Sequence, residues 1–595
     1  MTQQTNILCI LDGFGLSVDS VNNAVSRAKM PMLKKLLQTY PWATLNADGE
    51  AVGQEDGLVG NSEVGHMNIG GLKLVPQLSF QITKSAEDAF SLNSQLFPDQ
   101  LFDPKLVLPT VFTTSKVVHL FGLFSTGAIH SDLRHWVGAI EAAGRAGAEK
   151  IVLHLATDGR DSDRQSLVET WSHFIEEYKI RLQPFEKHMV LGSIAGRFYA
   201  MDRDKNWDRV AKGTGVLFAS NTEHLVEDYL QKTYQSKEKT DFYSKLSFQV
   251  NQSHSSFDSI KQEIQAVAQY NYEQEMYDEY IQPYSSWLHP IEPNDTLWLI
   301  NFRTDRMKQF AKLICDIQKE VNFSLNILAM NDYGDGNALA TNNESLSQNG
   351  VGYYPIFEPK PVENTLAQYI SSLGKTQLHI AETEKYNHVT YFLNGGQDKK
   401  WTGEEWIVIP SNKVNSHAEK PEMKAKEVTD TIIESLEQHR FDYIVVNYAN
   451  PDMVGHTGDI DAAISSMEFL DQQLGRLVEM CEQHGHKMII IADHGNIEKV
   501  GEYEENGKHL IDTEHNAHPV PCIFVDPHFN NHSFIQNLEE IQQNLNIKLD
   551  IQSISQAFNV NTTYDLSGRT WLTQQQINEK TQLPLWNAGV FLLTV

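Results

Sequence analysis

Polar residues follow three apolar runs of this sequence at the points where the runs end. The run NILCI leads into Asp12, FDYIVVN leads into a segment with Asp452 and His456, and KMIIIA leads into Asp493 and His494. Carboxylate oxygens and imidazole nitrogens are donors that suit Zn²⁺ or Mn²⁺, and no thiolate accompanies them. An isolated Asp-His-Gly is more often an ordinary turn. Three such sites together favour a metal centre.

Two further histidines compete for a place among these donors. His515 could supply another imidazole, and His518 stands three residues further on. The DxxxH spacing of Asp452 and His456 lets one loop turn both side chains toward a single ion. Composition does not choose between His515 and His518.

A serine between glycines offers a group on which such metals could act. In GNSEVGH, Ser62 stands between Asn61 and Glu63, and His66 follows. A serine hydroxyl is a weak nucleophile until a base or a metal activates it. The alternative is that Ser62 caps a helix. Both can hold, because the amides at a helix start favour a phosphate on the same oxygen. We assign His66 to packing or to support of the ligands.

Arginines recur in three turn or strand-end segments, which indicates an anion-binding group. Exposed arginines are usually solvated surface, but Arg303 and Arg306 could share a helical face and grip a phosphate or carboxylate. For Arg160 alone, a structural salt bridge is an equal alternative. Lys385, in AETEKYNH, adds a positive charge that could depress the pKa of the serine hydroxyl. The three segments are DGRD (158–161), AGRFYAMDRD (195–204) and NFRTDR (301–306).

The apolar runs alternate with longer amphipathic stretches, which is typical of an α/β fold with a largely parallel sheet. In such sheets, ligands gather outside the carboxyl ends of the strands. Strands lying side by side would bring the metal donors to one rim, so the two ends of the chain would form one domain around an inserted one. The predicted strands are 6–10, 150–155, 296–301, 441–447 and 487–492, and the predicted helices are 428–439 and 461–485, the second ending at Gly485.

The length, net charge and cysteine content of the chain restrict the class of protein. A chain of 595 residues is too long for one core. The net charge of −29 argues against non-specific binding to nucleic acid or to an anionic membrane. Four cysteines without CxxC spacing suit a reducing compartment. We see no signal peptide and no apolar run approaching the roughly 20 residues of a membrane span. We therefore expect a cytoplasmic protein without a membrane or nucleic-acid partner.

These segments together resemble the cofactor-independent (2,3-bisphosphoglycerate-independent) phosphoglycerate mutases of the alkaline phosphatase superfamily. The resemblance implies an alkaline-phosphatase-like metal-binding domain (1–78 and 309–595) interrupted by an inserted α/β phosphotransferase domain (79–308). It also implies interconversion of 3-phosphoglycerate and 2-phosphoglycerate in glycolysis and gluconeogenesis. The stretches that match in the family's order include LDGFG, GNSEVGHMNIG, GLFSTGAIHSDLRH, DGRDS, GRFYAMDRDKNWDRV, NFRTDR, IAETEKYNHVTYF, NYANPDMVGHTGD and ADHGN.

The resemblance implies a role for each site residue. Ser62 takes the phosphoryl group, the bound glycerate reorients, and its other hydroxyl takes the group back. Asp161 would be the general base for the glycerate hydroxyls, and Lys385 would assist the serine. Two Mn²⁺ ions and no 2,3-bisphosphoglycerate are implied, in a protein that we expect to be a monomer with a small-molecule substrate. One ion would be held by Asp452, His456 and His515, and the other by Asp12, Ser62, Asp493 and His494. The substrate would be held by His130, Arg160, Asp161, Arg197, Arg203, Arg303, Arg306 and Lys385.

The sequence departs from the family pattern in four places. The segment GGLKLV (70–75) replaces the usual GAGR, so its arginine is missing. Thr304 stands where proline is usual, and His518 follows His515 in an altered segment. The chain is also longer than typical members, and we place the excess near 90–115, near 220–290 and after about 571. The last of these segments ends apolar, and we expect it to pack onto the metal-binding domain.

A second hypothesis is a metal-dependent phosphohydrolase of the same superfamily, in which water takes the phosphoryl group from Ser62. The arginines and the DGRD segment favour the mutase, because a hydrolase need not grip the glycerate carboxylate. A homologue that has lost catalysis and serves as a binding protein is the third. The presence of every expected ligand and of the nucleophile argues against it.

Overall fold

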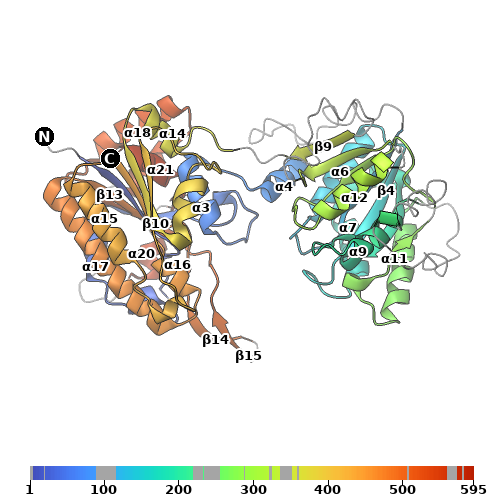
Figure 1. Ribbon diagram of the computed structural model, residues 1–595, viewed down its shortest axis with the longest axis horizontal. Coiled ribbons are helices and arrows are strands. Elements are labelled where there is room, and N and C mark those ends of the chain that lie inside the picture. Colours follow the sequence, from blue (N-terminus) through green and yellow to red (C-terminus); the bar gives the residue numbers. More distant parts are fainter. Residues whose placement is uncertain are drawn as a thin grey trace. The chain divides into compact units, whose positions relative to one another are not determined.

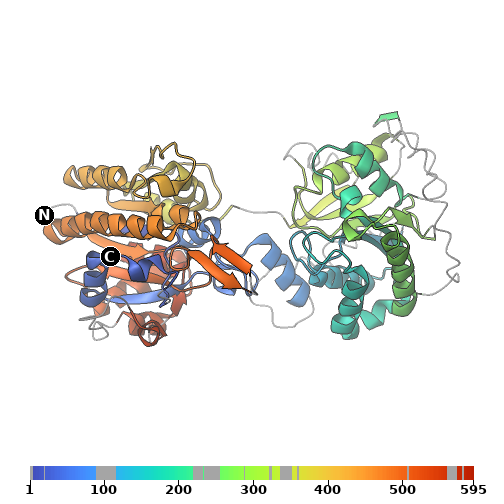
Figure 2. The ribbon, with the colours of Figure 1, turned by 90° about the horizontal axis from the view of Figure 1, so that it is seen from below.

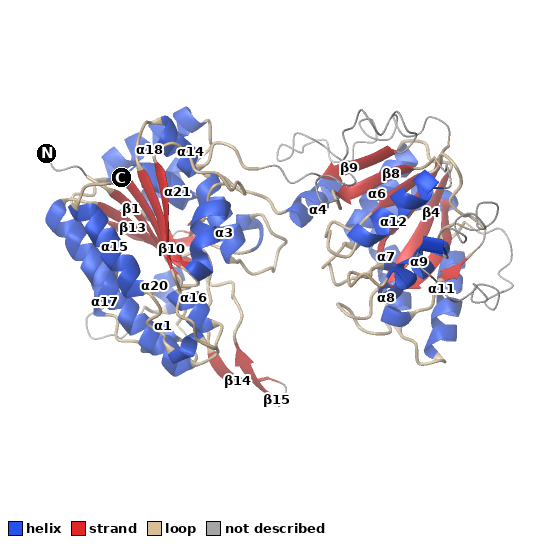
Figure 3. Cartoon of the chain, in the orientation of Figure 1, coloured by secondary structure: helices blue, strands red, loops and turns tan. Residues whose placement is uncertain are grey.

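The chain forms two compact units, which we describe separately. The first unit comprises Met1–Gln77 and Lys360–Val595, and the second comprises Leu78–Pro359 (Figure 1). In each, strands form one principal sheet with helices beside it (Figure 3). The computed structural model describes residues 4–18, 21–88, 115–218, 232–233, 255–286, 288–320, 324–334, 352–357, 361–505, 508–558, 572–578, 580 and 582–594.

The inserted unit extends further along the chain than we predicted. It begins one residue before the expected position 79, but it ends at Pro359 instead of 308. The reason is strand pairing: β8 (Asn326–Asn331) pairs in parallel with β7 (Thr296–Leu299), and β9 (Gly352–Phe357) pairs with β8. These strands extend the second sheet, so NFRTDR does not mark its end. The predicted excess segment near 90–115 lies almost wholly outside the described residues, as does the first part of the one near 220–290, up to residue 254.

The sheet of the first unit confirms the strands predicted at both ends of the chain. Strand β1 (Asn6–Leu11) lies between β12 (Tyr443–Tyr448) and β13 (Lys487–Ile491) and is parallel to both. The residues that follow these three strands therefore meet at one rim. The full order is β11-β10-β12-β1-β13-β16-β2-β17. The outer strands are β11 (Glu404–Ile409), β10 (Gln377–Glu382), β16 (Val520–Val525), β2 (Trp42–Asn46) and β17 (Gln582–Pro584).

Both predicted helices of this unit are present. The long helix α17 (Ile460–His484) lies along the sheet, and it ends at Gly485, whose φ of 74° suits glycine (Figure 2). Helix α15 (Ala425–Glu437) covers the same region as the predicted 428–439. The other helices are α1 (Ala24–Arg27), α2 (Pro31–Thr39), α3 (Ser62–Gly71), α14 (Leu366–Ser372), α16 (Asn450–Gly455), α18 (Asn531–Leu545), α19 (Ile551–Ala557), α20 (Gln574–Asn578) and α21 (Asn587–Thr594), beside a hairpin of β14 (Gly501–Glu505) and β15 (Lys508–Asp512).

The second unit has its own sheet and core. The order is β6-β5-β4-β3-β7-β8-β9, parallel except for β6. Successive residues such as Leu120 and Phe121 enter two different apolar clusters, as side chains on opposite faces of a strand do. Its remaining elements are β3 (Val117–Leu123), β4 (Lys150–Thr157), β5 (Met189–Gly196), β6 (Tyr284–Ser285), α4 (Leu78–Asp88), α6 (Leu133–Arg145), α7 (Leu167–Leu182), α8 (Arg197–Ala200), α9 (Trp207–Gly215), α11 (Phe257–Tyr272) and α12 (Lys308–Glu320).

Among the described residues, no helix combines the length and the apolar character that a membrane crossing needs.

Candidate active site

Ser62 opens helix α3, but it does not cap that helix. Asn61 is the N-cap: its side-chain oxygen accepts a hydrogen bond from the amide of Val64 at 3.0 Å. The alternative that Ser62 acts as the cap is therefore wrong. Because Asn61 satisfies the helix start, the Ser62 hydroxyl is available to other groups.

Three polar side chains surround the Ser62 hydroxyl. The Lys385 ammonium donates to its Oγ at 2.7 Å, and Oγ donates to Asp12 Oδ1 at 3.1 Å. The ring nitrogen Nε2 of His494 lies 2.9 Å away. Lys385 comes from the short helix Thr383–Lys385 after β10, whereas Asp12 and His494 follow β1 and β13. The strand-end residues that we predicted to converge do converge, and they meet at the serine.

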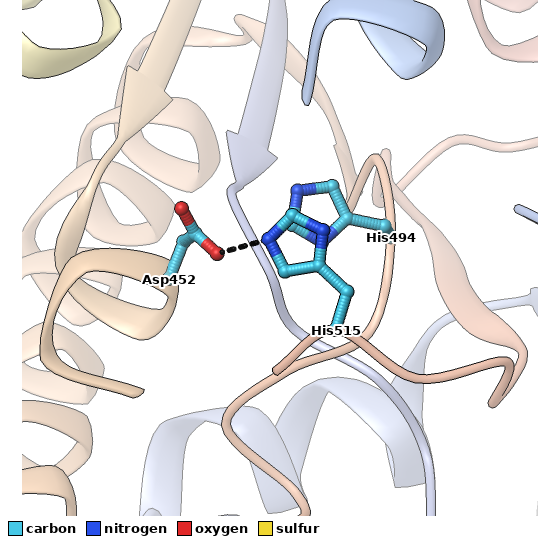
Figure 4. A group of neighbouring side chains, drawn as sticks. All are labelled: Asp452, His494 and His515. Atoms are coloured by element: carbon cyan, nitrogen blue, oxygen red, sulfur yellow. Dashed lines mark hydrogen bonds and ion pairs between the residues drawn. The ribbon is translucent and has the colours of Figure 1, made fainter. Parts of the chain in front are cut away.

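Asp452 gathers the two histidines that were predicted to join it. Its Oδ1 lies 3.2 Å from His456 Nε2 and 3.1 Å from His515 Nε2. The ring of His494 stacks on that of His515, with centroids 3.9 Å apart (Figure 4). Backbone carbonyls orient both Asp452 partners: Thr513 faces His456 Nδ1 at 2.7 Å, and Gly60 faces His515 Nδ1 at 2.9 Å. These contacts leave the Nε2 atoms of both histidines directed at the Asp452 carboxylate.

His518, the competing histidine, has a different partner. Its Nδ1 lies 3.1 Å from Glu498, a fully buried carboxylate that also accepts from the amides of Gly15 and Asn496. Asn496 in turn donates to Asp452 Oδ1 at 2.8 Å. The geometry thus groups His515 with Asp452, and it places His518 with a carboxylate that ties the surrounding loops together.

His66 contacts one of the metal donors. Its Nδ1 lies 3.2 Å from Asp493 Oδ2, and it also faces the carbonyl of Ser62 at 2.8 Å. On the other side of the ring, Asn447 donates toward Nε2 at 3.0 Å and to Asp12 at 2.6 Å. The i, i+4 spacing of Ser62 and His66 on one helix was the available signal. No residue pattern indicated the role of Asn447.

The buried charges in this cluster depend on one another. Burial alone would raise the pKa of Asp452, but Lys385 and the two histidines hold that pKa well below its usual range. Burial and the nearby Asp493 raise the pKa of Asp12. For Lys385, burial opposes the charged form, but Asp12 and Asp452 outweigh it and raise the pKa of its ammonium. Lys385 is therefore a permanent positive charge beside the serine.

The histidines beside Asp452 also respond to its charge. The hydrogen bond to Asp452 raises the pKa of His456. Burial would lower the pKa of His515, but its bond to Asp452 produces a net rise. The metal-free imidazoles thus bind protons more readily than usual. A cation that binds them must displace those protons.

In the second unit, Arg197 anchors the predicted anion site. It is 2% exposed, and its Nη1 donates to Asp158 and to Asp161 at 2.5 Å each. Asp158 also accepts from the Ser125 hydroxyl and from backbone amides of its own loop. Sequence reasoning missed Asp158 and Ser125, although both lie in segments that we singled out. Together they fix the guanidinium and the Asp161 carboxylate.

Two of the other predicted arginines lie beside Asp305. Arg203 Nη1 lies 3.1 Å from Asp305 Oδ2, and Arg303 Nε lies 3.5 Å from Oδ1. Arg306 donates to the carbonyl of Met201 at 3.1 Å. Arg303 and Arg306 lie in a turn that precedes α12, so the predicted shared helical face is wrong. Arg160 is about half exposed, and its guanidinium lies 3.9 Å from Glu279.

Electrostatic effects show that these groups act on one another. Burial, and then the charges of Arg197, Arg203 and Arg160, lower the pKa of Arg306. Burial and Arg197 lower the pKa of His130 to about 4, so His130 is neutral near pH 7. Its buried Nδ1 and the buried Nε of Arg197 have no hydrogen-bond partner among the described residues. A negatively charged ligand would relieve the repulsion and satisfy such groups.

Comparison with known proteins identifies the family of the chain. The model of the metalloenzyme superfamily matches residues 4–552. A 2,3-bisphosphoglycerate-independent phosphoglycerate mutase of Pseudomonas fluorescens (strain Pf0-1) is 35% identical over 535 residues, which cover 88% of this chain and 92% of that protein. The chain belongs to this mutase family. A mutase of Clostridium novyi (strain NT) is 34% identical, with the same coverage. A solved phosphoglycerate mutase of Leishmania mexicana, 24% identical with a TM-score of 0.45, covers 88% of this chain and 90% of its own.

Membership of the mutase family confirms the predicted fold class, an α/β metalloenzyme domain interrupted by an inserted domain, and it makes the chain an enzyme of metal-dependent type. The donors fit a divalent cation. In each of two groups, one donor atom per residue lies within 4.8 Å of the others. The buried Oδ2 of Asp493 has no aligned hydrogen bond to the part of the chain that the structure describes, and it offers an oxygen to a cation. The groups are Asp452, His494 and His515, and Asp12, His66 and Asp493.

Proposed function

We propose that the protein interconverts 3-phosphoglycerate and 2-phosphoglycerate without 2,3-bisphosphoglycerate, through a phosphoserine at Ser62 and with two Mn²⁺ ions. The observation that carries the proposal is the environment of the Ser62 hydroxyl. Lys385, His494 and Asp12 lie within 3.1 Å of it at the start of α3. An ammonium, an imidazole and a carboxylate around a serine hydroxyl are the kinds of group that activate it as a nucleophile.

The first step transfers the phosphoryl group to the enzyme. Ser62 Oγ attacks the phosphorus of phosphoglycerate, the bond from phosphorus to the glycerate oxygen breaks, and that oxygen takes a proton from the Asp161 carboxyl group. Asp12 Oδ1 accepts the hydrogen bond of the Ser62 hydroxyl and can take its proton. The Lys385 ammonium stabilises the charge that develops on Oγ.

The return step uses the other glycerate hydroxyl. That hydroxyl loses its proton to the Asp161 carboxylate and attacks the phosphoserine. The bond from phosphorus to Ser62 Oγ breaks, and Oγ takes its proton back from Asp12. We assign Asp161 this role because Arg197 holds its carboxylate in place. The arginines bind the carboxylate and phosphate of the substrate, and neutral His130 offers a hydrogen bond. These residues are Arg160, Arg197, Arg203, Arg303 and Arg306.

Divalent cations would stabilise the attacking and leaving oxygens of both transfers. We propose that Asp452, His456 and His515 hold one ion. We propose that Asp12, Ser62, Asp493 and His494 hold the other, with His66 beside Asp493. We also propose that the enzyme acts in the cytoplasm as a monomer, without a nucleic-acid or membrane partner.

A coupled assay on chelator-stripped protein tests the proposal. The reaction starts from 3-phosphoglycerate without 2,3-bisphosphoglycerate, Mn²⁺ is added back, and free phosphate is followed in parallel. We expect 2-phosphoglycerate to form only after metal is added, with no matching release of phosphate. Release of phosphate in place of 2-phosphoglycerate would show a phosphohydrolase.

A further inference from the structure

Residues beyond the family match form part of the core of the first unit. The superfamily model ends at residue 552, yet strand β17 pairs in parallel with β2, and nearly every residue of α21 is buried. Helix α21 packs against α3, and also against β1 and β13 (Figure 1). The prediction that this segment packs onto the metal-binding domain is confirmed. It packs against the elements that carry Ser62, Asp12 and Asp493.

The contact between α21 and α3 requires a glycine. A Cβ atom at Gly589 would lie 2.1 Å from the carbonyl oxygen of Ile69 and 2.8 Å from the Leu72 side chain. Real Cβ atoms do not approach a backbone oxygen so closely, so any side chain at position 589 would force the two helices apart. The opposite side of α21 is anchored by the Phe591 ring, which lies 5.4 Å from that of Phe558. The position of α3 is therefore set by its close contact with α21.

Leu72, at the end of α3, depends on the same contact. Its φ is 55°, a left-handed conformation that leucine rarely adopts, and its side chain is almost fully buried. Leu72 belongs to the segment GGLKLV, where the sequence departs from the family pattern. Burial beside Gly589 compensates for the unfavourable backbone of this residue. The altered segment GGLKLV and helix α21 thus contact each other at Leu72 and Gly589.

The other side of α3 lies against the segment that follows Lys385. A Cβ at Gly70 would lie 1.9 Å from the carbonyl oxygen of Leu393. Leu393 directly follows the π-helical turn His388–Phe392, which itself follows Lys385. Helix α3 is therefore held between α21 and the segment that carries Lys385. The distance of 2.7 Å between Lys385 Nζ and Ser62 Oγ depends on this arrangement.

We propose that α21 positions the nucleophile, with Gly589 and Leu72 as positioning residues that hold α3, and so Ser62, against Lys385. The inference rests on the proposed role of Ser62. Neither residue touches the reacting atoms, and the arginines that bind substrate belong to the other unit. Displacement of α3 should therefore change the rate of phosphoryl transfer much more than the affinity for substrate.

The test compares Gly589→Ala and Leu72→Gly with the unaltered enzyme in the presence of metal. For Gly589→Ala we expect kcat to fall at least about tenfold, because an error of about 1 Å in position can cost about a hundredfold, while KM stays within about twofold. Leu72→Gly keeps a backbone that suits the left-handed conformation but removes the side chain beside Gly589. It should also lower kcat, to a smaller extent. Amide hydrogen exchange of residues 62–71 should accelerate in both variants.

A matched control separates positioning from loss of stability. Ile432→Ala removes a fully buried side chain from α15, which packs on α17, β10 and β12. At a temperature where all variants are folded, this control should keep kcat and the exchange of residues 62–71 close to the unaltered values. The inference is overturned if Gly589→Ala retains full kcat and unchanged exchange, or if Ile432→Ala lowers kcat equally. Absence of mutase activity in the unaltered enzyme would instead refute the proposed function.

Discussion

The Ser62 cluster and the exposed arginines Arg160, Arg203 and Arg303 lie in different units and differ in how their charge is compensated. Lys385 is 4% exposed and lies 2.6 Å from both Asp12 and Asp452, so its charge is compensated within the protein. The Arg303 side chain is 53% exposed, and among the described residues its one carboxylate neighbour is Asp305, at 3.5 Å. The first arrangement fixes geometry before a ligand arrives. The second keeps positive charge available for an anion.

This difference follows from the two tasks. A nucleophile must be held within a fraction of an ångström of its reacting position, which buried and mutually bonded groups achieve. A ligand that is bound, turned and released needs groups that can adjust, and long exposed arginines do so at little cost in stability. The predictions below test this contrast.

The largest effect should come from removing the nucleophile. Ser62→Ala should lower kcat by at least about 10³-fold, because no other group takes the phosphoryl. The arginine group remains intact, so calorimetry should show phosphoglycerate binding close to that of the unaltered enzyme. Substantial mutase activity in Ser62→Ala would contradict the phosphoserine mechanism.

Lys385→Met, in the buried Ser62 cluster, should destabilise the protein more than a substitution in the exposed arginine group does. In metal-free protein it leaves Asp12 and Asp452 without their shared cation, so the free energy of unfolding should fall by about 3 kcal/mol or more. Arg303→Ala, the control, should change that free energy by less than about 1 kcal/mol. Denaturant titrations measure both values. Equal losses would mean that the buried and exposed charges do not differ as described.

Arg303→Ala should weaken substrate binding and leave metal binding unchanged. Loss of one charge-assisted contact should raise KM for phosphoglycerate about tenfold or more. The dissociation constant for Mn²⁺, measured by calorimetry, should not change. Arg303→Lys keeps the positive charge but loses the paired N–H donors of the guanidinium. Its KM should therefore lie between the values for the unaltered enzyme and for Arg303→Ala. An unchanged KM in Arg303→Ala would remove Arg303 from the proposed site.

A further effect is a dependence of metal binding on pH. Contact with Asp452 raises the pKa of His456 and of His515, so acid favours protons over metal. The Mn²⁺ dissociation constant should rise by up to about tenfold per pH unit for each proton displaced as pH falls from 8 to 6. In metal-free protein these histidines add stability below about pH 6.5, and that contribution is lost as pH rises through the raised pKa values. A dissociation constant that is flat with pH would contradict the assigned ligands.

Much of the first unit was predictable because parallel strands buried on both faces appear as continuous apolar runs. Because ligands gather at the carboxyl ends of parallel strands, the sequence alone predicts that Asp12, Asp452 and Asp493 lie on one rim. The boundary at Pro359 was not predictable in this way, since it depends on β8 pairing with β7. Pairing partners are not encoded in local pattern.

The finer contacts depend on distances that a sequence does not contain. Asp158 and Asp305 stand inside the arginine segments, but a carboxylate beside an arginine can equally well face solvent. Only the fold shows that Asp158 fixes Arg197 and that Asp305 is shared by two arginines. His66 was likewise visible as a histidine, but its approach to Asp493 required the packing of α3.

The most direct test of the central claim is rapid-quench mass spectrometry of the peptide that contains Ser62. Metal-loaded enzyme is mixed with 3-phosphoglycerate and quenched at times shorter than one turnover. The mechanism predicts a phosphorylated Ser62 that forms at least as fast as the first 2-phosphoglycerate. Formation of 2-phosphoglycerate at full rate without phosphate on Ser62 at any time would contradict it.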